Sequence, residues 1–157
     1  MPYTDPIVLG LLLVSLIGSL VYQWRRGLRG GRLAVVTVAM FYGFAAIIAL
    51  GMHCLDVLYG YSHRNTSFIT GKPFAWDWHT YSLLLFGVVM VLSGVQCLRL
   101  ALRLGRGDAG ARMEFLRLSS VILLVVVPLI PIQAMFGVVA AGLSVIALLA
   151  VGLGGRA

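Results

Sequence analysis

Five side chains that could take part in chemistry lie within one short part of the chain: His53, Asp56, His63, Asp77 and His79. His53 and Asp56 stand three residues apart, so they share a face if this segment is helical, as histidine and carboxylate ligands do in the metal sites of helical bundles. With His63 and His79 they form a candidate site for copper, zinc or iron. Haem held by His53 and His79 is less favoured, because the two positions differ in depth and both histidines must bind one iron. Alternatively, His53 and Asp56 could hydrogen-bond to a quinone at a membrane surface and protonate it.

A structural explanation of these residues is simpler, and we favour it. Asp56 stands near the end of an apolar segment, where it could pair with Arg64 or Lys72, and histidines at that depth hydrogen-bond to water and head groups. The five residues taken together follow no recognised metal-binding motif, and nothing in the sequence requires a cofactor. No serine has a histidine or carboxylate at a recognisable catalytic spacing, and no phosphate-binding loop is present. The sequence therefore assigns no catalytic residue and favours a protein without catalytic activity of its own.

The composition indicates the environment that must hold these residues. Of the 157 residues, 61% are apolar and 11% are charged, against about 45–50% and about 25% in soluble domains. Lys and Arg are absent from 6–24, 33–61 and 81–98, and 118–153 has no charged residue at all. About 20 apolar residues suffice for a helix to cross a bilayer. The sequence thus predicts an all-α, polytopic bundle of transmembrane helices.

The whole chain, 1–157, is predicted to form a single integral membrane domain. The segment from 118 to 153 is too long for one crossing, and Pro128 and Pro131 interrupt it. We therefore favour a hairpin near 131–134 and five helices, while one kinked helix would leave four. The expected helices are 6–24, 33–58, 81–102, 115–131 and 134–153, with an outer loop at 62–80 and cytoplasmic loops at 25–32 and 103–114.

Arginines are concentrated in two connections between apolar segments, which predicts their orientation. Short Arg-rich loops stay in the cytoplasm and attract anionic lipids, so we interpret them in this way and not as a nucleic-acid surface. The residues assigned to orientation and anionic lipid are Arg25, Arg26, Arg29, Arg32, Arg103, Arg106 and Arg112, and Arg99 and Arg117 belong to the second group. The expected location is a bacterial inner membrane, with the N-terminus outside and the C-terminus inside.

Two further sets of residues suggest contacts with other proteins. The outer loop is rich in aromatic side chains that could lie on the membrane surface or against a partner: Phe68, Phe74, Trp76 and Trp78. Gly43 and Gly51 lie on one face of the second predicted helix, and small residues at such spacing let helix backbones approach closely.

These features together favour a small accessory or scaffold subunit of a larger membrane complex, with a respiratory or photosynthetic electron-transfer assembly as the expected host. The expected partners are membrane lipids and other membrane subunits. Two alternatives remain open. One is a metal-, haem- or quinone-handling protein that uses the outer-face residues, and the other is a small oligomeric transporter or channel.

Overall fold

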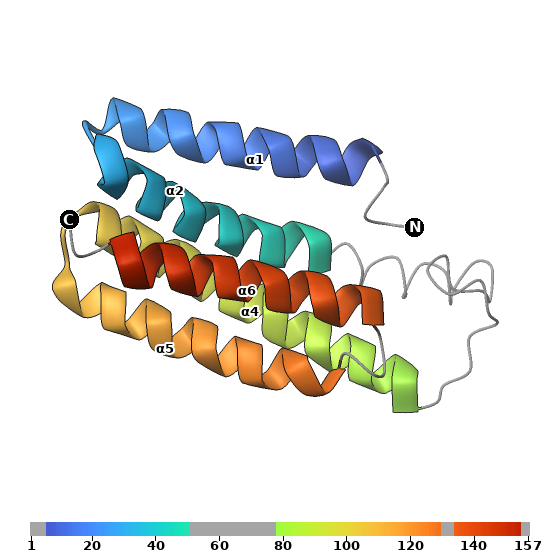
Figure 1. Cartoon of the computed structure of the whole chain (residues 1–157). Helices are drawn as coiled ribbons and strands as arrows, with labels where there is room; N and C mark the ends of the chain where they lie inside the picture. The colour runs from blue at the N-terminus through green and yellow to red at the C-terminus, as the bar shows by residue number, and fades with distance from the viewer. Residues whose placement is uncertain (1–5, 51–77, 130–133, 155–157) are drawn as a thin grey trace.

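The computed structural model describes residues 6–50, 78–129 and 134–154, and these form five α-helices without a strand (Figure 1). The helices are α1 (Pro6–Arg25), α2 (Gly30–Ala45), α4 (Trp78–Gly105), α5 (Ala109–Val126) and α6 (Ala134–Gly154). A π-helical turn, η2 (Ala46–Leu50), continues α2, and a 3-10 turn, η3 (Val127–Leu129), ends α5. The predicted all-helical class and the favoured count of five helices are confirmed.

Three of the helices are long and apolar enough to cross a membrane. Their apolar parts are Gly30–Ile48, Leu85–Gly105 and Gly137–Gly154, which contain 19, 21 and 18 residues. At about 1.5 Å per residue each is roughly 27–32 Å long, close to the ~30 Å hydrocarbon core of a bilayer. A shorter apolar stretch, Leu9–Arg25, covers most of α1. The helices are therefore compatible with integration into a membrane.

Helix α2 lies at the centre of the arrangement. It packs against α1, α4 and α6, while α5 packs against α4 and α6. Helix α1 lies at the edge of the bundle, with its main contacts on α2 and η2 (Figure 1). Neighbouring helices run antiparallel, so the turns after α1 and α4 and the end of α6 all lie at the same end of the bundle.

The turns after α1 and α4 are built in the same way. Gly27 and Gly107 have φ angles of 87° and 89°, in the left-handed region that glycine enters without steric cost. In both turns the residue after the glycine donates its backbone N–H to the carbonyl five residues earlier, over 3.2 Å. These bonds satisfy carbonyls that a helix end would otherwise leave without a donor. Both basic connections are therefore short, defined turns.

The second connection is shorter than the sequence predicts. The expected loop at 103–114 is reduced to residues 106–108, because α4 continues to Gly105 and α5 begins at Ala109. The side chain of Asp108 caps α5, since its Oδ1 accepts hydrogen bonds from the backbone N–H groups of Gly110 and Ala111 at 2.9 and 3.4 Å. A cap of this kind lets a helix start directly after the turn.

Helix α4 also begins earlier than predicted. The outer loop was expected to include 78–80, but these residues form the first turn of α4. No glycine or proline separates Trp78 from Tyr81, and a helix satisfies its backbone polar groups as it leaves the hydrocarbon region. The helix therefore continues through the aromatic residues at its start.

Helices α5 and α6 form the antiparallel pair that the hairpin interpretation requires. Arg112, near the start of α5, donates hydrogen bonds to the carbonyls of Val151 and Gly152, near the end of α6. Pro131 lies outside the described residues. The placement of the two helices nevertheless excludes a single continuous helix for 118–153.

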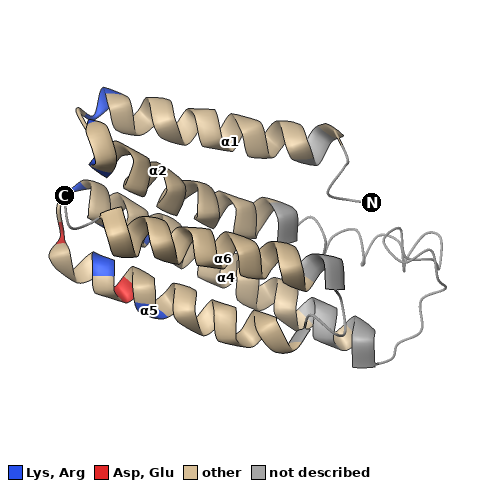
Figure 2. Cartoon of the chain, viewed as in Figure 1, with Lys and Arg blue, Asp and Glu red and all other residues tan. Residues whose placement is uncertain are grey.

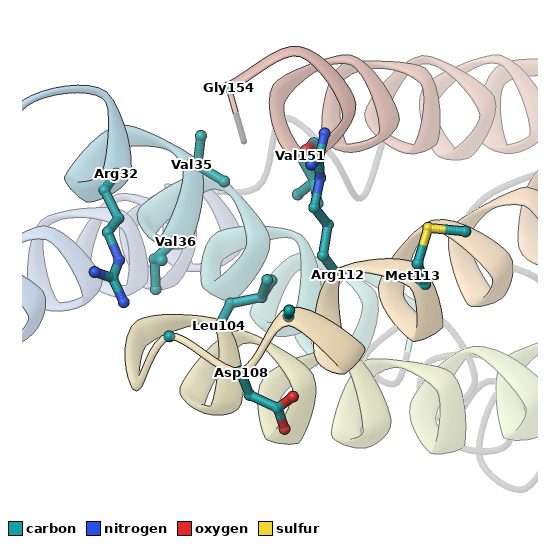
Figure 3. A pocket seen from close by; sticks show the side chains of 11 residues that line it. Arg32, Val35, Val36, Leu104, Asp108, Arg112, Met113, Val151 and Gly154 are labelled. Carbon is teal, nitrogen blue, oxygen red and sulfur yellow. Dashed lines mark hydrogen bonds between the residues drawn. The ribbon is translucent and has the colours of Figure 1, made fainter. Parts of the chain in front are cut away.

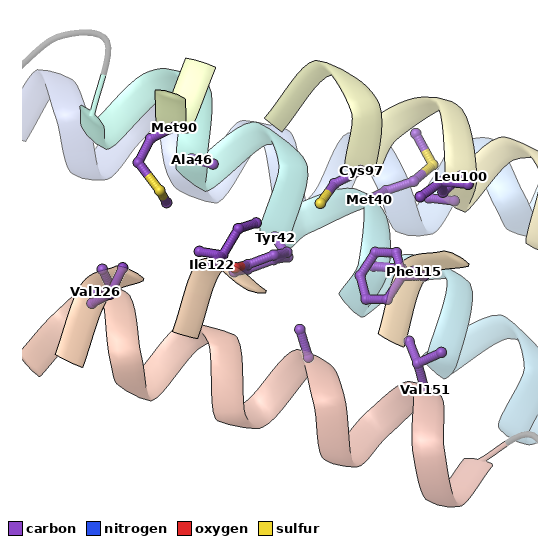
Figure 4. Close-up of a cluster of buried hydrophobic side chains, with 14 of the residues drawn as sticks. Met40, Tyr42, Ala46, Met90, Cys97, Leu100, Phe115, Ile122, Val126 and Val151 are labelled. Carbon is purple, nitrogen blue, oxygen red and sulfur yellow. The ribbon is translucent and has the colours of Figure 1, made fainter. Parts of the chain in front are cut away.

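The core is formed by four of the helices. Buried side chains from α2, α4, α5 and α6 pack into one cluster (Figure 4). At its centre the rings of Tyr42 and Phe115 meet edge to face, with centroids 6.2 Å apart, and Cys97, Leu100 and Val151 surround them. No described residue of α1 belongs to this cluster, so α1 packs outside the hydrophobic core that the other four helices form.

Candidate functional site

Most of the outer-face residues singled out in the sequence lie outside the described ranges: His53, Asp56, His63, Gly51, Phe68, Phe74 and Trp76. Trp78 and His79 belong to the first turn of α4. Among the described residues, no group of three or more His, Cys, Asp or Glu side chains could hold a metal ion. The metal, haem or quinone site therefore stays a prediction from the sequence.

Gly43 packs within the chain itself. A Cβ added to Gly43 would lie 2.9 Å from the carbonyl oxygen of Gly94, and one added to Gly94 would lie 2.8 Å from that of Gly43. The two glycines thus face each other where α2 crosses α4. The sequence suggested a contact with another protein at Gly43, whereas the helix that approaches it in the structure is α4 of the same chain. The sequence analysis did not identify Gly94. Its position as a glycine inside an apolar helix is the feature that could have indicated this contact.

Arg103 is fully engaged with both described carboxylates. Its Nε donates to Oδ2 of Asp108 at 2.8 Å, and its Nη1 donates to Oε2 of Glu114 at 2.7 Å. The hydrogen bond from Arg103 lowers the pKa of Asp108 below its ordinary value, burial opposes this shift, and the backbone N–H groups of Gly110 and Ala111 reinforce it. Arg103 therefore joins the end of α4 to the start of α5.

Two other arginines assigned to lipid in the sequence also make contacts inside the chain. The guanidinium of Arg112 donates from Nε and Nη2 to the last carbonyls of α6, at 3.2 and 2.7 Å. In the first turn, Nη1 of Arg29 donates to the carbonyls of Trp24 and Leu28 at 2.8 and 2.9 Å. Arg112 thus satisfies carbonyls at the end of α6, and Arg29 satisfies one carbonyl at the end of α1 and one in the turn that follows. Arg112 and Arg29 thus have a structural role at the basic end.

All charged residues in the described ranges lie toward the same end of the bundle (Figure 2). They are nine arginines and two acidic residues, and both acidic residues are bound to Arg103. Arg26 lies over the ring of Tyr22, at 5.6 Å from its centroid. Several exposed arginines have side chains that make no hydrogen bond or ion pair within the described part: Arg25, Arg99, Arg106 and Arg117. This end therefore carries a strong excess of positive charge.

A pocket of about 420 Å³ opens at the basic end between α2, the α4–α5 turn and the end of α6 (Figure 3). Arg32 and Arg112 contribute its positive charge, and Val35, Val36 and Leu104 contribute apolar surface. In Figure 3 the side chain of Arg112 extends toward Val151 on α6. The pocket combines charge with apolar walls, as a site for an amphipathic molecule would.

Helix α1 has an unusual distribution of side chains. The described residues that it buries are Ser19 and Gln23, at 2% and 0% exposure, while ten of its large hydrophobic side chains are exposed. Nε2 of Gln23 donates to the sulfur of Met40 on α2 at 2.7 Å. Polar groups thus lie in the contact with α2, and apolar side chains point away from the protein.

An apolar groove of about 580 Å³ runs along the contact between α1 and α2. Leu11, Val14 and Tyr22 of α1 line it together with Phe44 of α2, and Leu102 of α4 also contributes to its wall. Its wall is almost entirely hydrocarbon. The groove is therefore suited to an apolar chain or an apolar side chain, and it offers no group for catalysis.

Tyr42 and Ser144 form a buried polar contact that the sequence analysis did not identify. Their hydroxyl oxygens lie 2.7 Å apart, and Oγ of Ser144 donates to the carbonyl of Ala140 at 2.8 Å. Because a serine hydroxyl has one hydrogen, Tyr42 must be the donor in the contact between the two side chains. This bond links α2 to α6 and satisfies both hydroxyl groups in the core.

Comparison with known proteins finds no match to this chain among family models, curated proteins or solved structures.

Proposed function

We propose that this chain is a small accessory or scaffold subunit of a larger membrane protein complex. The observation that carries the proposal is the arrangement of α1, which buries Ser19 and Gln23 against α2 and exposes ten large hydrophobic side chains. An apolar outer surface is stable in lipid or against other membrane helices, not in water. Helix α1 thus offers a long apolar surface to a neighbour, at the edge of the bundle and outside its hydrophobic core.

The distribution of polar groups also supports a role in assembly over one in transport. Within the described parts of α1, α2 and α6, from Pro6 to Trp24, Leu33 to Leu50 and Ala134 to Gly154, there is no charged residue. Transport pathways and proton relays use ionisable groups inside the membrane. We propose an electron-transfer assembly as the host, by analogy, because such assemblies contain small helical subunits.

The proposed orientation places the arginine-rich end in the cytoplasm of a bacterium and the N-terminus on the outer side of the inner membrane. The nine arginines at this end, against two acidic residues in the described ranges, support that orientation. The antiparallel arrangement of α5 and α6 then directs the end of α6 to the cytoplasmic side.

Purification in a mild detergent, followed by mass spectrometry of the bound proteins, tests the proposal. We expect at least one membrane protein to co-purify in a fixed ratio. Replacing Leu13 and Ile17 on the exposed side of α1 with tryptophan should release it, because the larger rings obstruct close helix packing. The matched control replaces Val145 and Ile146, which are exposed on α6. A chain that purifies alone, with α1 variants indistinguishable from the wild type, would contradict the proposal.

Two measurements on the same preparation address the alternatives. Stoichiometric copper or a haem spectrum that disappears in His53→Ala would support a metal-handling protein over a pure scaffold. Solute or ion flux into liposomes that contain only this chain, above the flux into empty liposomes, would support a transporter. We expect neither signal.

A further inference from the structure

The Arg103–Glu114 ion pair fixes how α4 and α5 are aligned. Its Nη1 to Oε2 distance is 2.7 Å, so the two side chains meet between two antiparallel helices. Farther from the connection between α4 and α5, Arg99 lies one helical turn before Arg103. In the same way, Arg117 lies one helical turn after Glu114. At about 1.5 Å per residue, Arg99 lies roughly 9 Å from the end of α4 at Gly105, and Arg117 lies roughly 12 Å from the start of α5 at Ala109. They therefore occupy nearly the same level on neighbouring helices.

Both arginines face outward. Residues three or four apart are neighbours on a helix surface. Arg99 therefore lies on the same face of α4 as Arg103, and Arg117 lies on nearly the same face of α5 as Glu114. Both side chains are exposed, and neither makes a hydrogen bond or ion pair within the described part of the chain. The nearest carboxylate on the same surface is Glu114, which is bound to Arg103 by two hydrogen bonds. Two positive charges thus lie at one level without a described counter-charge.

Gln96 lies next to them, deeper in the bundle. It is three residues before Arg99 in an apolar part of α4, is exposed, and has no hydrogen-bonding partner in the described ranges. An exposed amide at this depth is unfavourable in hydrocarbon unless a partner accepts its N–H groups. Farther along the same face, Leu92, Val88 and Leu85 are exposed at 66%, 58% and 69%. Along this face of α4, from the basic end inward, a charged side chain is therefore followed by an amide and then by apolar side chains.

We propose that Arg99, Arg117 and Gln96 form a binding site for one anionic phospholipid of the cytoplasmic leaflet. The two guanidinium groups bind the phosphate, the amide of Gln96 donates to an ester carbonyl, and an acyl chain follows Leu92, Val88 and Leu85. Guanidinium groups bind phosphate oxygens through charge-assisted hydrogen bonds. The charge on Arg99 and Arg117 selects an anionic lipid over a zwitterionic one. This site rests on the proposed membrane orientation but does not require a partner subunit.

Native mass spectrometry of the full chain, titrated with phosphatidylglycerol, tests the site. One arginine near an anionic surface changes affinity about fivefold, so Arg99→Gln with Arg117→Gln should weaken binding of the first lipid about thirtyfold. The matched control, Arg25→Gln with Arg106→Gln, removes the same charge from exposed positions at the same end and should leave that lipid in place. Gln96→Leu keeps both charges and should weaken binding by a smaller factor.

Several results would overturn the proposal. An equal loss in the control pair would mean a general attraction to the basic end. Equal binding of phosphatidylcholine would exclude selection by charge, and displacement of the lipid by inorganic phosphate would identify a free anion as the ligand. If the Arg99 and Arg117 variants keep the lipid but lose a co-purifying protein, the surface binds a subunit. Circular dichroism and thermal unfolding establish that each variant is folded. Co-purification and lipid binding are measured separately, so the proposed function and this site can fail independently.

Discussion

Asp108 has two roles at the turn between α4 and α5. One carboxylate oxygen caps α5, and the other accepts from Arg103 at 2.8 Å. Asp108→Ala removes both interactions, whereas Asp108→Asn keeps an oxygen that can cap the helix. We expect the alanine variant to lose stability because its first-turn N–H groups lose their acceptor, and the asparagine variant to lose less. Thermal unfolding in detergent compares them. Equal destabilisation would mean that the cap has little effect.

The pKa of Asp108 predicts a pH dependence of stability. Arg103 lowers the folded-state pKa of Asp108 below its ordinary value. The charged form is thus favoured in the folded protein, and its contribution is complete above the unfolded-state pKa. It is lost as the pH falls through the lowered folded-state pKa. The wild type and Asp108→Asn should therefore converge in unfolding temperature as the pH is lowered into this acidic range. A constant difference between them down to the most acidic pH would contradict the prediction.

The hydrogen bond between Tyr42 and Ser144 has a defined donor. In Tyr42→Phe, Ser144 keeps its own bond to the carbonyl of Ala140, so no buried donor is left without an acceptor. We expect a loss of about 0.5–1.5 kcal/mol, measured by thermal unfolding. A double-mutant cycle with Ser144→Ala isolates the contact, and a coupling energy near zero would show that the two hydroxyl groups contribute separately.

At the scale of the elements, the contact between α2 and α4 depends on the absence of side chains at Gly43 and Gly94. A methyl group on Gly43 would meet the backbone oxygen of Gly94 at 2.9 Å, and a helix backbone cannot yield as a flexible side chain does. Gly43→Ala should therefore destabilise the protein by about 1–3 kcal/mol.

Gly142 in α6 is the matched control, because a Cβ there meets no atom within 4 Å. Gly142→Ala should leave stability unchanged or raise it slightly, since alanine favours a helix. Thermal unfolding of the two variants makes the comparison. Equal effects would mean that helix propensity, and not the crossing of α2 over α4, decides the outcome.

At the scale of the whole molecule, the distribution of charge predicts the orientation in the membrane. Cysteine introduced at Arg106, in the turn after α4, should react with a membrane-impermeant maleimide only after the cells are opened. Cysteine at Tyr3 should react in intact cells. Both variants are made after Cys54 and Cys97 are replaced. Labelling of the Arg106 position in intact cells would reverse the proposed orientation.

The sequence by itself determined the helical class, the five helices and the grouping of the arginines. These depend on local composition: long runs without charge form helices of membrane length, and prolines 128 and 131 interrupt a run that is too long for one crossing. The helix ends were less predictable. The start of α5 depends on the Asp108 cap and on the bond from Arg103, which act across the turn.

Only the tertiary structure decided what each polar residue and each glycine contacts. The sequence pattern assigned all the arginines to orientation and anionic lipid. In the structure, Arg103 and Arg112 bind other residues of the same chain, whereas the side chains of Arg99 and Arg117 are exposed. Packing also set Gly43 against Gly94 and turned the apolar surface of α1 outward. These contacts join residues far apart in sequence, and the alignment of neighbouring helices that creates them leaves no signal in local composition.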